Sequence, residues 1–363
     1  MLALDEDDTF LEVAEEPPAP QPLLAQTRSL GLKQSAVRWL PSAVVGNRAL
    51  ALAGSWDDPE SNELSMWSVQ AEAPADEGSM MTDAAAAAQP TLSAAMVGSA
   101  AHSGCVLGMS VGGTRRIVAF TASGTGGASC YTVEVGDGPN DAVTLRPQWT
   151  AVAAPAGGLA TLGVCFNGES HVCAAGEDGV LSVVDAERGV LAWKAQTREA
   201  ALFDVGWCPG VSDHLVVTAG TTLGIWDLRV RAAAPQQTLA PTPGVEAHAA
   251  AALLCVSADR QQQHRIAAGA SDGAVHVWDV RAAGAGAGGV QAPVKSIPGA
   301  HGGDVWGVQL GSGPHGEMLS CGSDGLLVAW SSLELNGGGG DYFPPRPRSL
   351  VQLSLPINSL GAR

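Results

Sequence analysis

Short apolar strands separated by tight turns recur along the chain. In five places a turn of small residues leads into a strand in which apolar and variable positions alternate, often as far as a Trp: residues 53–68, 174–185, 218–227, 268–279 and 321–331. Alternation with a period of two is typical of a half-buried β-strand, and an Asp-Gly pair between two such strands predicts a hairpin. No segment has a helical periodicity strong enough to compete with this pattern.

A further apolar strand precedes each hairpin, at residues 36–41, 162–167, 203–209, 252–257 and 304–310. The turn glycines Gly176, Gly220, Gly269 and Gly322 follow one another at intervals of 44, 49 and 53 residues, close to the repeat length of four-stranded propeller blades. A sixth, degenerate unit fits residues 102–135, which lack an Asp-Gly turn. The repeats therefore predict an all-β propeller.

Composition changes sharply outside the repeats. Residues 1–28 are acidic and rich in Pro, with too few large apolar side chains to offset the entropy of ordering, so they predict a disordered tail. Residues 29–363 are predicted to form the propeller. Within it, low-complexity or Gly-rich and Pro-rich segments predict loops or linkers at 70–95, 282–293 and 334–347.

The repeats resemble the WD40 β-propeller family. WD dipeptides occur at Trp226-Asp227 and Trp278-Asp279. In that family a His, an Asp, a Trp and a hydroxyl residue staple each blade through hydrogen bonds. Two sets of residues match this staple, namely His301, Asp324 and Trp330 in one repeat and His248, Asp272 and Trp278 in the repeat before it.

The hydroxyl position of the staple departs from the family pattern. Cys321 and Ala268 stand where the resemblance implies Ser or Thr. We expect both staples to be incomplete, with each lost hydrogen bond reducing stability by about 1 kcal/mol.

A narrower resemblance concerns the two ends of the folded body. The run AVRWLPSAVVGNRALALAGSWDDPESNELSMWSV is similar to the opening of the small WD-repeat nucleoporins of the Y-shaped outer ring of the nuclear pore. The stretches HGGDVWGVQL, MLSCGSDGLLVAW and RSLVQLSLPINSL are similar to the last repeats of that family. Together these segments place residues 35–360 within the resemblance, whereas the acidic tail and the Ala-rich and Gly-rich insertions match nothing in it.

The resemblance implies a propeller of the seven-bladed type with six clear blades and an incomplete seventh. Residues 348–363 are expected to begin the seventh blade, and residues 29–34 are expected to form its outer strand. An open blade would expose unpaired backbone groups. Truncation of the sequence is the preferred explanation, ahead of completion by residues 1–25 or by a partner chain.

This resemblance also implies a function. The chain is expected to be a non-enzymatic scaffold in the outer ring of the nuclear pore complex, at the nuclear envelope. Its expected partners are other outer-ring nucleoporins, including an α-solenoid subunit, and it would support transport of protein and mRNA indirectly. The sequence contains no FG repeats, so contact with cargo receptors is not expected.

Charge and hydropathy narrow the classes of partner. The net charge of −17 repels nucleic acid, which argues against direct binding to it. Every long apolar run is interrupted well before the ~20 residues that a membrane-spanning helix needs, and the acidic N-terminus does not resemble a secretory signal. The seven cysteines form no Cys-x-x-Cys pair, which favours a reducing compartment, the cytosol or nucleus.

No constellation of residues indicates catalysis or a bound cofactor. The eight histidines are scattered among the repeats, and His171 with Cys173 makes only a pair, too few ligands for a metal site. The glycine-rich segments 124–127 and 284–289 are not followed by the Lys-Ser/Thr of a phosphate loop. The sequence therefore predicts no enzyme activity, no metal and no cofactor.

Three residues are candidates for partner contacts. Trp56 lies in a polar turn, where its ring is expected either to fold onto the blade edge or to meet a partner. Arg229 and Arg281 end Trp-Asp-x-Arg tetrapeptides, which resemble those of substrate receptors of cullin-4 ubiquitin ligases. That resemblance gives the alternative function, although such an Arg more often neutralises a nearby acid within its own propeller.

Overall fold

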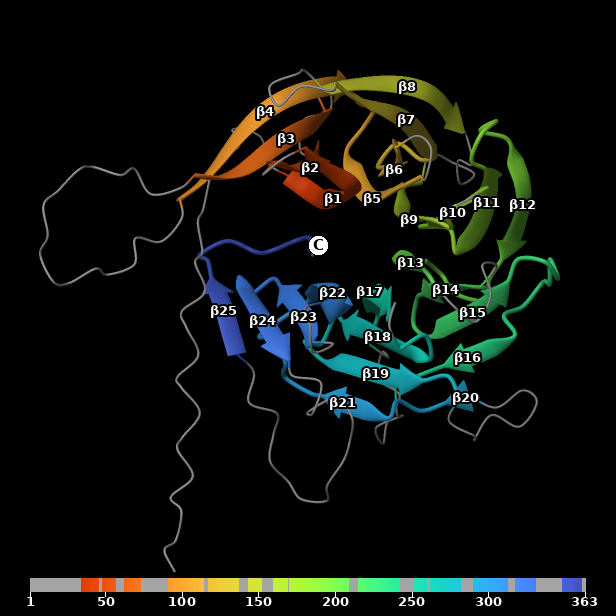
Figure 1. The fold of residues 1–363 in the computed structure, drawn as a ribbon. Helices are drawn as coiled ribbons and strands as arrows, with labels where there is room; N and C mark the ends of the chain where they lie inside the picture. The colour runs from red at the N-terminus through yellow and green to blue at the C-terminus, as the bar shows by residue number, and fades with distance from the viewer. Residues whose placement is uncertain are drawn as a thin grey trace, which may run out of the picture.

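The computed structural model describes residues 34–45, 48–56, 62–72, 91–113, 117–136, 143–151, 159–168, 170–208, 215–241, 251–259, 262–281, 290–312, 317–330 and 348–360. These residues form 25 strands and no helix. The strands make six sheets arranged around a central axis, with the first strand of each sheet innermost (Figure 1). The predicted all-β propeller is therefore confirmed.

Each of the first three sheets is a four-stranded antiparallel blade in sequence order. Blade 1 contains β1 (Gln34–Val45), β2 (Arg48–Ser55), β3 (Glu63–Glu72) and β4 (Thr91–Ala101). Blade 2 contains β5 (Val106–Gly112), β6 (Ile117–Ser123), β7 (Ala128–Val135) and β8 (Val143–Ala151). Blade 3 contains β9 (Thr161–Phe166), β10 (His171–Gly176), β11 (Val180–Asp185) and β12 (Leu191–Gln196).

Blades 4 and 5 share a connection, whereas blade 6 is a separate four-stranded sheet. Blade 4 contains β13 (Asp204–Trp207), β14 (Leu215–Ala219), β15 (Leu223–Asp227) and β16 (Gln237–Leu239). Blade 5 contains β17 (Leu253–Ala258), β18 (Arg265–Ala270), β19 (Val275–Asp279) and β21 (Lys295–Ile297). Between β19 and β21 the chain crosses to blade 4, where β20 (Val290–Gln291) pairs in parallel with β16. Blade 6 contains β22 (Val305–Ser312), β23 (Glu317–Gly322), β24 (Leu326–Trp330) and β25 (Arg348–Gln352).

Apolar side chains fill the spaces between neighbouring blades. Five clusters of buried residues each join two successive blades; one, for example, packs Leu52 and Met66 of blade 1 against Val106 and Met109 of blade 2. Another packs Val277 of blade 5 against blade 6. The alternation in the sequence therefore supplies two apolar faces per blade, one for each neighbour.

A one-residue bulge interrupts the innermost strand of several blades at the same place. In β22 the register skips Trp306, because Val305 pairs with Gly322 and Gly307 pairs with Cys321. In β5 and β17 the same skip omits Leu107 and Leu254. A bulge redirects the side chain that it carries. This explains how Trp306, on a strand of the repeat, keeps 40 % of its surface exposed.

The end of blade 6 differs from the expectation. Residues 348–352 pair with β24 as the outer strand of blade 6, so they do not begin a seventh blade. Beyond them the Leu353 and Ile357 amides donate to Gly325 and Gly322, and the Val37 amide of β1 donates to Ser359 at 3.3 Å. Residues 353–360 therefore bridge blades 6 and 1, at the position where the first strand of a seventh blade would start.

The predicted insertions overlap the strands at their edges. Residues 70–72 end β3, residues 91–95 begin β4, and residues 290–291 form β20. The predicted tail at 1–28 and the segment 334–347 lie outside the described residues. Of the expected outer strand at 29–34, residues 29–33 also lie outside them, and Gln34 begins β1.

Candidate docking surface

Blade 6 contains a complete polar staple. The Trp330 indole N–H donates to Ser320 Oγ at 2.9 Å, and Ser320 Oγ lies 2.8 Å from His301 Nε2. His301 Nδ1 lies 3.1 Å from Asp324 Oδ1. Because a carboxylate only accepts, Nδ1 donates its proton to Asp324. The hydroxyl is Ser320 and not Cys321, so the expectation of an incomplete staple in this blade was wrong.

Blade 5 has the weaker version of this arrangement. Asp272 Oδ1 accepts from the Ala274 amide at 3.0 Å, which holds the hairpin turn. Trp278 is fully buried, and among the described residues its indole nitrogen has no hydrogen-bond partner. Ala268 occupies the position of Ser320 and offers no hydroxyl. His248 lies outside the described residues.

Two further blades are stapled by residues that the sequence analysis did not identify. In blade 2, His102 Nδ1 donates to the Gly104 carbonyl at 2.8 Å, and Nε2 lies 2.9 Å from Thr121 Oγ1. In blade 4, both carboxylate oxygens of Glu199 accept from the amides and hydroxyls of Thr221 and Thr222. Glu199 comes from the segment before β13 and binds the turn residues Thr221 and Thr222, while the Trp226 indole donates to Thr218 Oγ1 at 3.1 Å as Trp330 does to Ser320. Among the described residues no His takes part in this blade, so a search for His cannot find the contact.

The innermost strands of blades 1 and 4 carry opposite charges. Arg38 donates from Nη1 to the Val37 and Leu360 carbonyls at 2.8 and 2.9 Å. Asp204 accepts from the Val205 and Val256 amides at 2.8 and 3.0 Å. Burial raises the pKa of Asp204 to about 6, against the lowering effect of these amides and of Arg38. No sequence pattern indicated these two residues, because neither belongs to the repeat motif.

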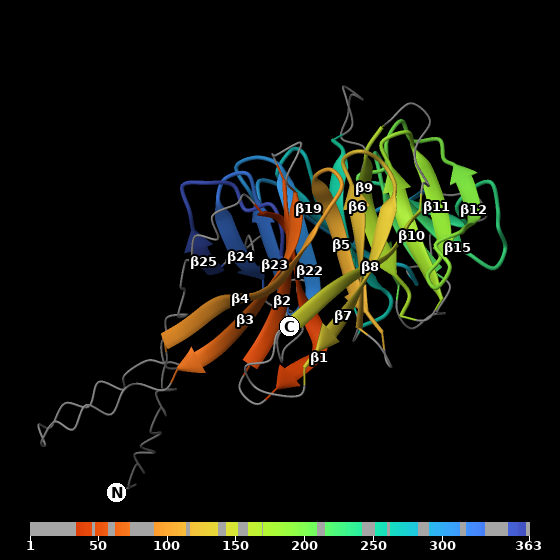
Figure 2. The same ribbon diagram turned by 90° about the horizontal axis from the view of Figure 1, so that it is seen from above.

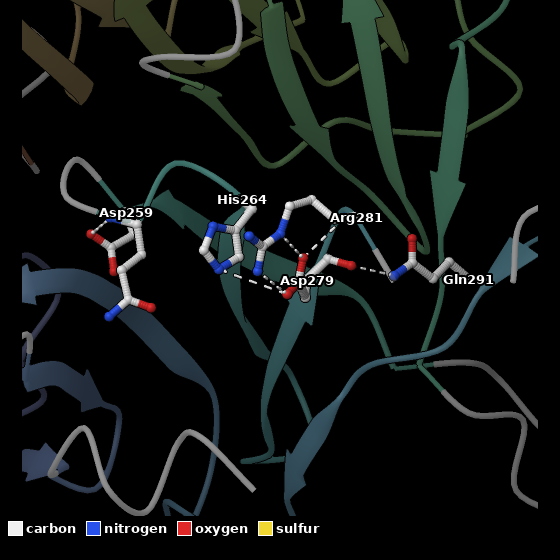
Figure 3. Close-up of polar contacts among 6 residues, drawn as sticks. Asp259, His264, Asp279, Arg281 and Gln291 are labelled. Carbon is white, nitrogen blue, oxygen red and sulfur yellow. Dashed lines mark hydrogen bonds and ion pairs between the residues drawn. The ribbon is translucent and has the colours of Figure 1, made fainter. Parts of the chain in front are cut away.

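The two Trp-Asp-x-Arg corners have nearly the same geometry. In blade 4 the Arg229 guanidinium donates from Nε and Nη2 to Asp227, with a shortest distance of 2.6 Å. In blade 5 Arg281 donates from Nε to Asp279 Oδ1 at 3.1 Å and from Nη2 to Asp279 Oδ2 at 2.9 Å (Figure 3). Both arginines are solvent-exposed, and each is already paired with the acid two residues before it.

Asp279 connects several groups at this corner (Figure 3). His264 Nε2 lies 3.7 Å from Asp279 Oδ2, and the Gln291 side-chain amide donates to the Asp279 carbonyl. The hydrogen bond from Arg281 is the main cause that lowers the pKa of Asp279, aided by His264 and opposed by partial burial. Gln291 belongs to β20, so this corner also ties blade 5 to blade 4.

Comparison with known proteins agrees with the geometry. No family model matches the chain. Human nucleoporin Nup43 is 27 % identical over 314 residues, which cover 83 % of this chain and 74 % of the relative. The chain is a WD40-type propeller that resembles Nup43. Mouse Nup43 gives the same identity and coverage, and the Dictyostelium discoideum nuclear pore complex protein nup43 is 23 % identical over 170 residues, covering 46 % of this chain and 36 % of the relative.

The similarity to Nup43 supports the resemblance drawn from the two ends of the sequence, since a match over 83 % of the chain must include most of the blades. Among the described residues no cluster of His, Cys, Asp or Glu could hold a metal ion. Within the same residues, no helix is long and apolar enough to cross a membrane. All seven cysteines are free, and Trp56 is 38 % exposed at the end of β2.

Proposed function

We propose that the chain is a subunit of the nuclear pore complex that acts as a structural scaffold in the Y-shaped outer ring, at the nuclear envelope. The observation that carries this proposal is the similarity to Nup43 over 83 % of the chain. A propeller presents rigid surfaces with short protected edges, which suits a role in holding neighbouring subunits. The chain would support transport of protein and mRNA indirectly, without enzymatic activity.

The proposed partners are other outer-ring nucleoporins, including an α-solenoid subunit. The fold does not determine which protein binds, so the partner class comes from the similarity alone. Direct binding to nucleic acid is not proposed, because the net charge of −17 opposes it.

Affinity capture from nuclear-envelope extract tests the proposal. We expect the tagged full-length chain to recover outer-ring nucleoporins, and a fluorescent fusion to label the nuclear rim. Recovery of a cullin-4 adaptor without nucleoporins would overturn the proposal. The double variant Arg229→Glu and Arg281→Glu is the matched control, since it should abolish adaptor binding and leave nucleoporin recovery unchanged.

A further inference from the structure

The two ends of the propeller differ in charge. Each antiparallel blade has two ends. One of them, here called the upper end, contains the start of the first strand, the turn between the second and third strands, and the end of the fourth strand (Figure 2). Acidic side chains gather there among the described residues: Glu63, Glu177, Asp178, Glu199, Asp272, Asp304 and Asp324. Arg198 is the single Lys or Arg that the described part of the chain places at this end.

Among the described residues the opposite end is close to neutral, because its arginines come with acids. Arg229 and Arg281 lie there, each bonded to the acid two residues before it. An approaching partner therefore meets a negative field at the upper end and a mixed one at the lower end. Such a field attracts and orients segments of opposite charge.

The hydrogen bonds at the upper end favour the charged form of two of its acids. Partial burial raises the pKa of Asp324, but hydrogen bonds from the Gly302 and Leu326 amides and from His301 outweigh that effect, and the net pKa lies below its ordinary value. Partial burial also raises the pKa of Glu199, and hydrogen bonds from Thr221 and Thr222 outweigh it. Both carboxylates are therefore ionised at neutral pH.

Large apolar side chains are exposed within this acidic end at blade 6. Trp306 is 40 % exposed on the bulge of β22, and Leu353 and Leu355 are 38 % and 71 % exposed after β25. The turn between β23 and β24 contacts both segments, because the Leu353 amide donates to Gly325 and the Ser323 amide donates to Asp304. Leu353 and Asp304 lie two residues before Leu355 and Trp306 in sequence. We call Asp304, Trp306, Asp324, Leu353 and Leu355 the upper patch.

A cavity lies beside the upper patch, between blades 6 and 1. Its volume is about 210 Å³, and its lining includes Ala36 and Val37 of β1 together with Leu353, Pro356 and Ile357. The lining also includes the polar residues Gln34, Ser35, Asn358 and Ser359. The five apolar residues are the majority, so the cavity can accept an apolar side chain from outside. Exposed apolar area of this kind marks interaction sites when polar residues surround it.

We propose that the upper patch and the adjacent cavity bind a segment of a partner protein in which apolar side chains are flanked by Lys or Arg. The apolar side chains would cover Trp306, Leu353 and Leu355, and one would enter the cavity. The basic side chains would face Asp304 and the other acids of the upper end. This inference goes beyond the proposed function, since it specifies the chemistry of the bound segment and holds for any complex that contains the chain.

A short fluorescein-labelled peptide with a Leu-Leu pair between two Arg-Arg pairs provides the test. We expect saturable binding to the full-length chain by fluorescence polarisation, weakening as salt screens the acids. Replacing the arginines by glutamates, or the leucines by serines, should weaken binding at least about tenfold, equivalent to ~1.4 kcal/mol. Absence of binding, or equal binding of the glutamate peptide, would overturn the proposal.

Two double variants locate the site. Trp306→Ser with Leu355→Ser should weaken binding at least about fivefold, whereas Val190→Ser with Leu191→Ser, which alters exposed residues on the outer side of blade 3, should leave it unchanged. Equal loss of peptide binding in the two double variants, or loss in neither, would contradict the assignment of the site. Thermal unfolding of each variant shows that it is folded. Failure to recover nucleoporins would overturn the proposed function alone, so the two failures are distinguishable.

Discussion

Blades 5 and 6 have the same strand order and the same Ser-Asp-Gly turn, yet they use their buried tryptophans differently. In blade 6 the Trp330 indole donates to Ser320, which connects it to His301 and Asp324. In blade 5 the Trp278 indole is equally buried but has no partner within the described residues. Packing is therefore enough to hold an indole in a blade, and the staple adds a polar connection from the blade to the segment before it.

The two blades also differ in what holds their first strands. The Val256 amide of blade 5 donates to the buried carboxylate of Asp204, at 3.0 Å. The Leu310 amide of blade 6 donates to the neutral hydroxyl of Ser257, at 3.1 Å. Protonation can thus change the contact at blade 5, whereas the contact at blade 6 has no titratable acceptor.

The largest expected effect comes from removing the hydroxyl of blade 6. Ser320→Ala would leave Trp330 Nε1 and His301 Nε2 without their partner in the interior, so we expect a loss of about 2–3 kcal/mol in the free energy of unfolding. Urea denaturation measures it. Ser320→Thr is the control, since it keeps the hydroxyl. A loss below about 0.5 kcal/mol for the Ala variant would show that blade 6 depends on packing as much as blade 5 does.

The second effect concerns pH and the first strand of blade 5. Burial raises the pKa of Asp204 to about 6, against an ordinary value of 3.8 in the unfolded chain. The folded state therefore binds this proton more tightly, and the stability that Asp204 contributes is fully present below pH 3.8 and is lost as pH rises through about 6. The change is at most a few kcal/mol, because one pKa unit corresponds to about 1.4 kcal/mol.

Asp204→Asn tests the cause, since Asn cannot titrate in this range. The charged groups around Asp204 include Arg38, which remains ionised between about pH 4 and 6 and adds no pH dependence there. The slope of the free energy of unfolding against pH in this range should therefore decrease in the variant. Urea midpoints across that range measure the slope. The Ser257→Ala variant removes the contact to the first strand of blade 6 and should lower stability without changing this slope, because Ser257 does not titrate. An unchanged slope in Asp204→Asn would contradict the assignment.

The third effect is a gain. Ala268→Ser would place a hydroxyl where blade 6 has Ser320, within reach of the unpartnered Trp278 indole, and we expect about 1 kcal/mol of stabilisation. Ala268→Cys adds comparable volume with a much weaker acceptor and serves as the control. Equal or lower stability of the Ser variant would mean that the difference between the two blades is not a missing acceptor.

The comparison also shows what the sequence could reveal. The blade repeat, its Asp-Gly turns and the gap at Ala268 follow from local pattern, because a hairpin fixes its own register. Ser320 was missed because the repeats were aligned on Gly269 and Gly322. Aligning the Ser-Asp-Gly turns instead matches Gly322 with Ala270, and therefore Ser320 with Ala268.

Contacts between segments far apart in sequence could not be predicted from the local pattern. Residues 348–352 form an apolar strand that could pair with β24 or begin another blade, and only the register with β24 decides between them. Glu199 binds Thr222 in the turn between β14 and β15, and Asp204 gains its raised pKa from burial among strands that are far apart in sequence. Trp306 has the alternation of a packed residue, and the bulge that exposes it depends on the pairing with β23.

The smallest effect is expected at the Asp-x-Arg corners, which blades 4 and 5 have and blade 6 lacks. Arg229 and Arg281 are exposed, and water screens their ion pairs with Asp227 and Asp279, so replacing either by Ala should change the free energy of unfolding by less than about 0.5 kcal/mol. Urea denaturation of the two single variants measures this. A larger loss in Arg281→Ala than in Arg229→Ala would show that the link through Asp279 and Gln291 strengthens the corner of blade 5. Equal and small losses would show that neither ion pair contributes measurably to folding, so that any loss of cullin-4 adaptor binding in the Arg229→Glu and Arg281→Glu variant could not be explained by unfolding.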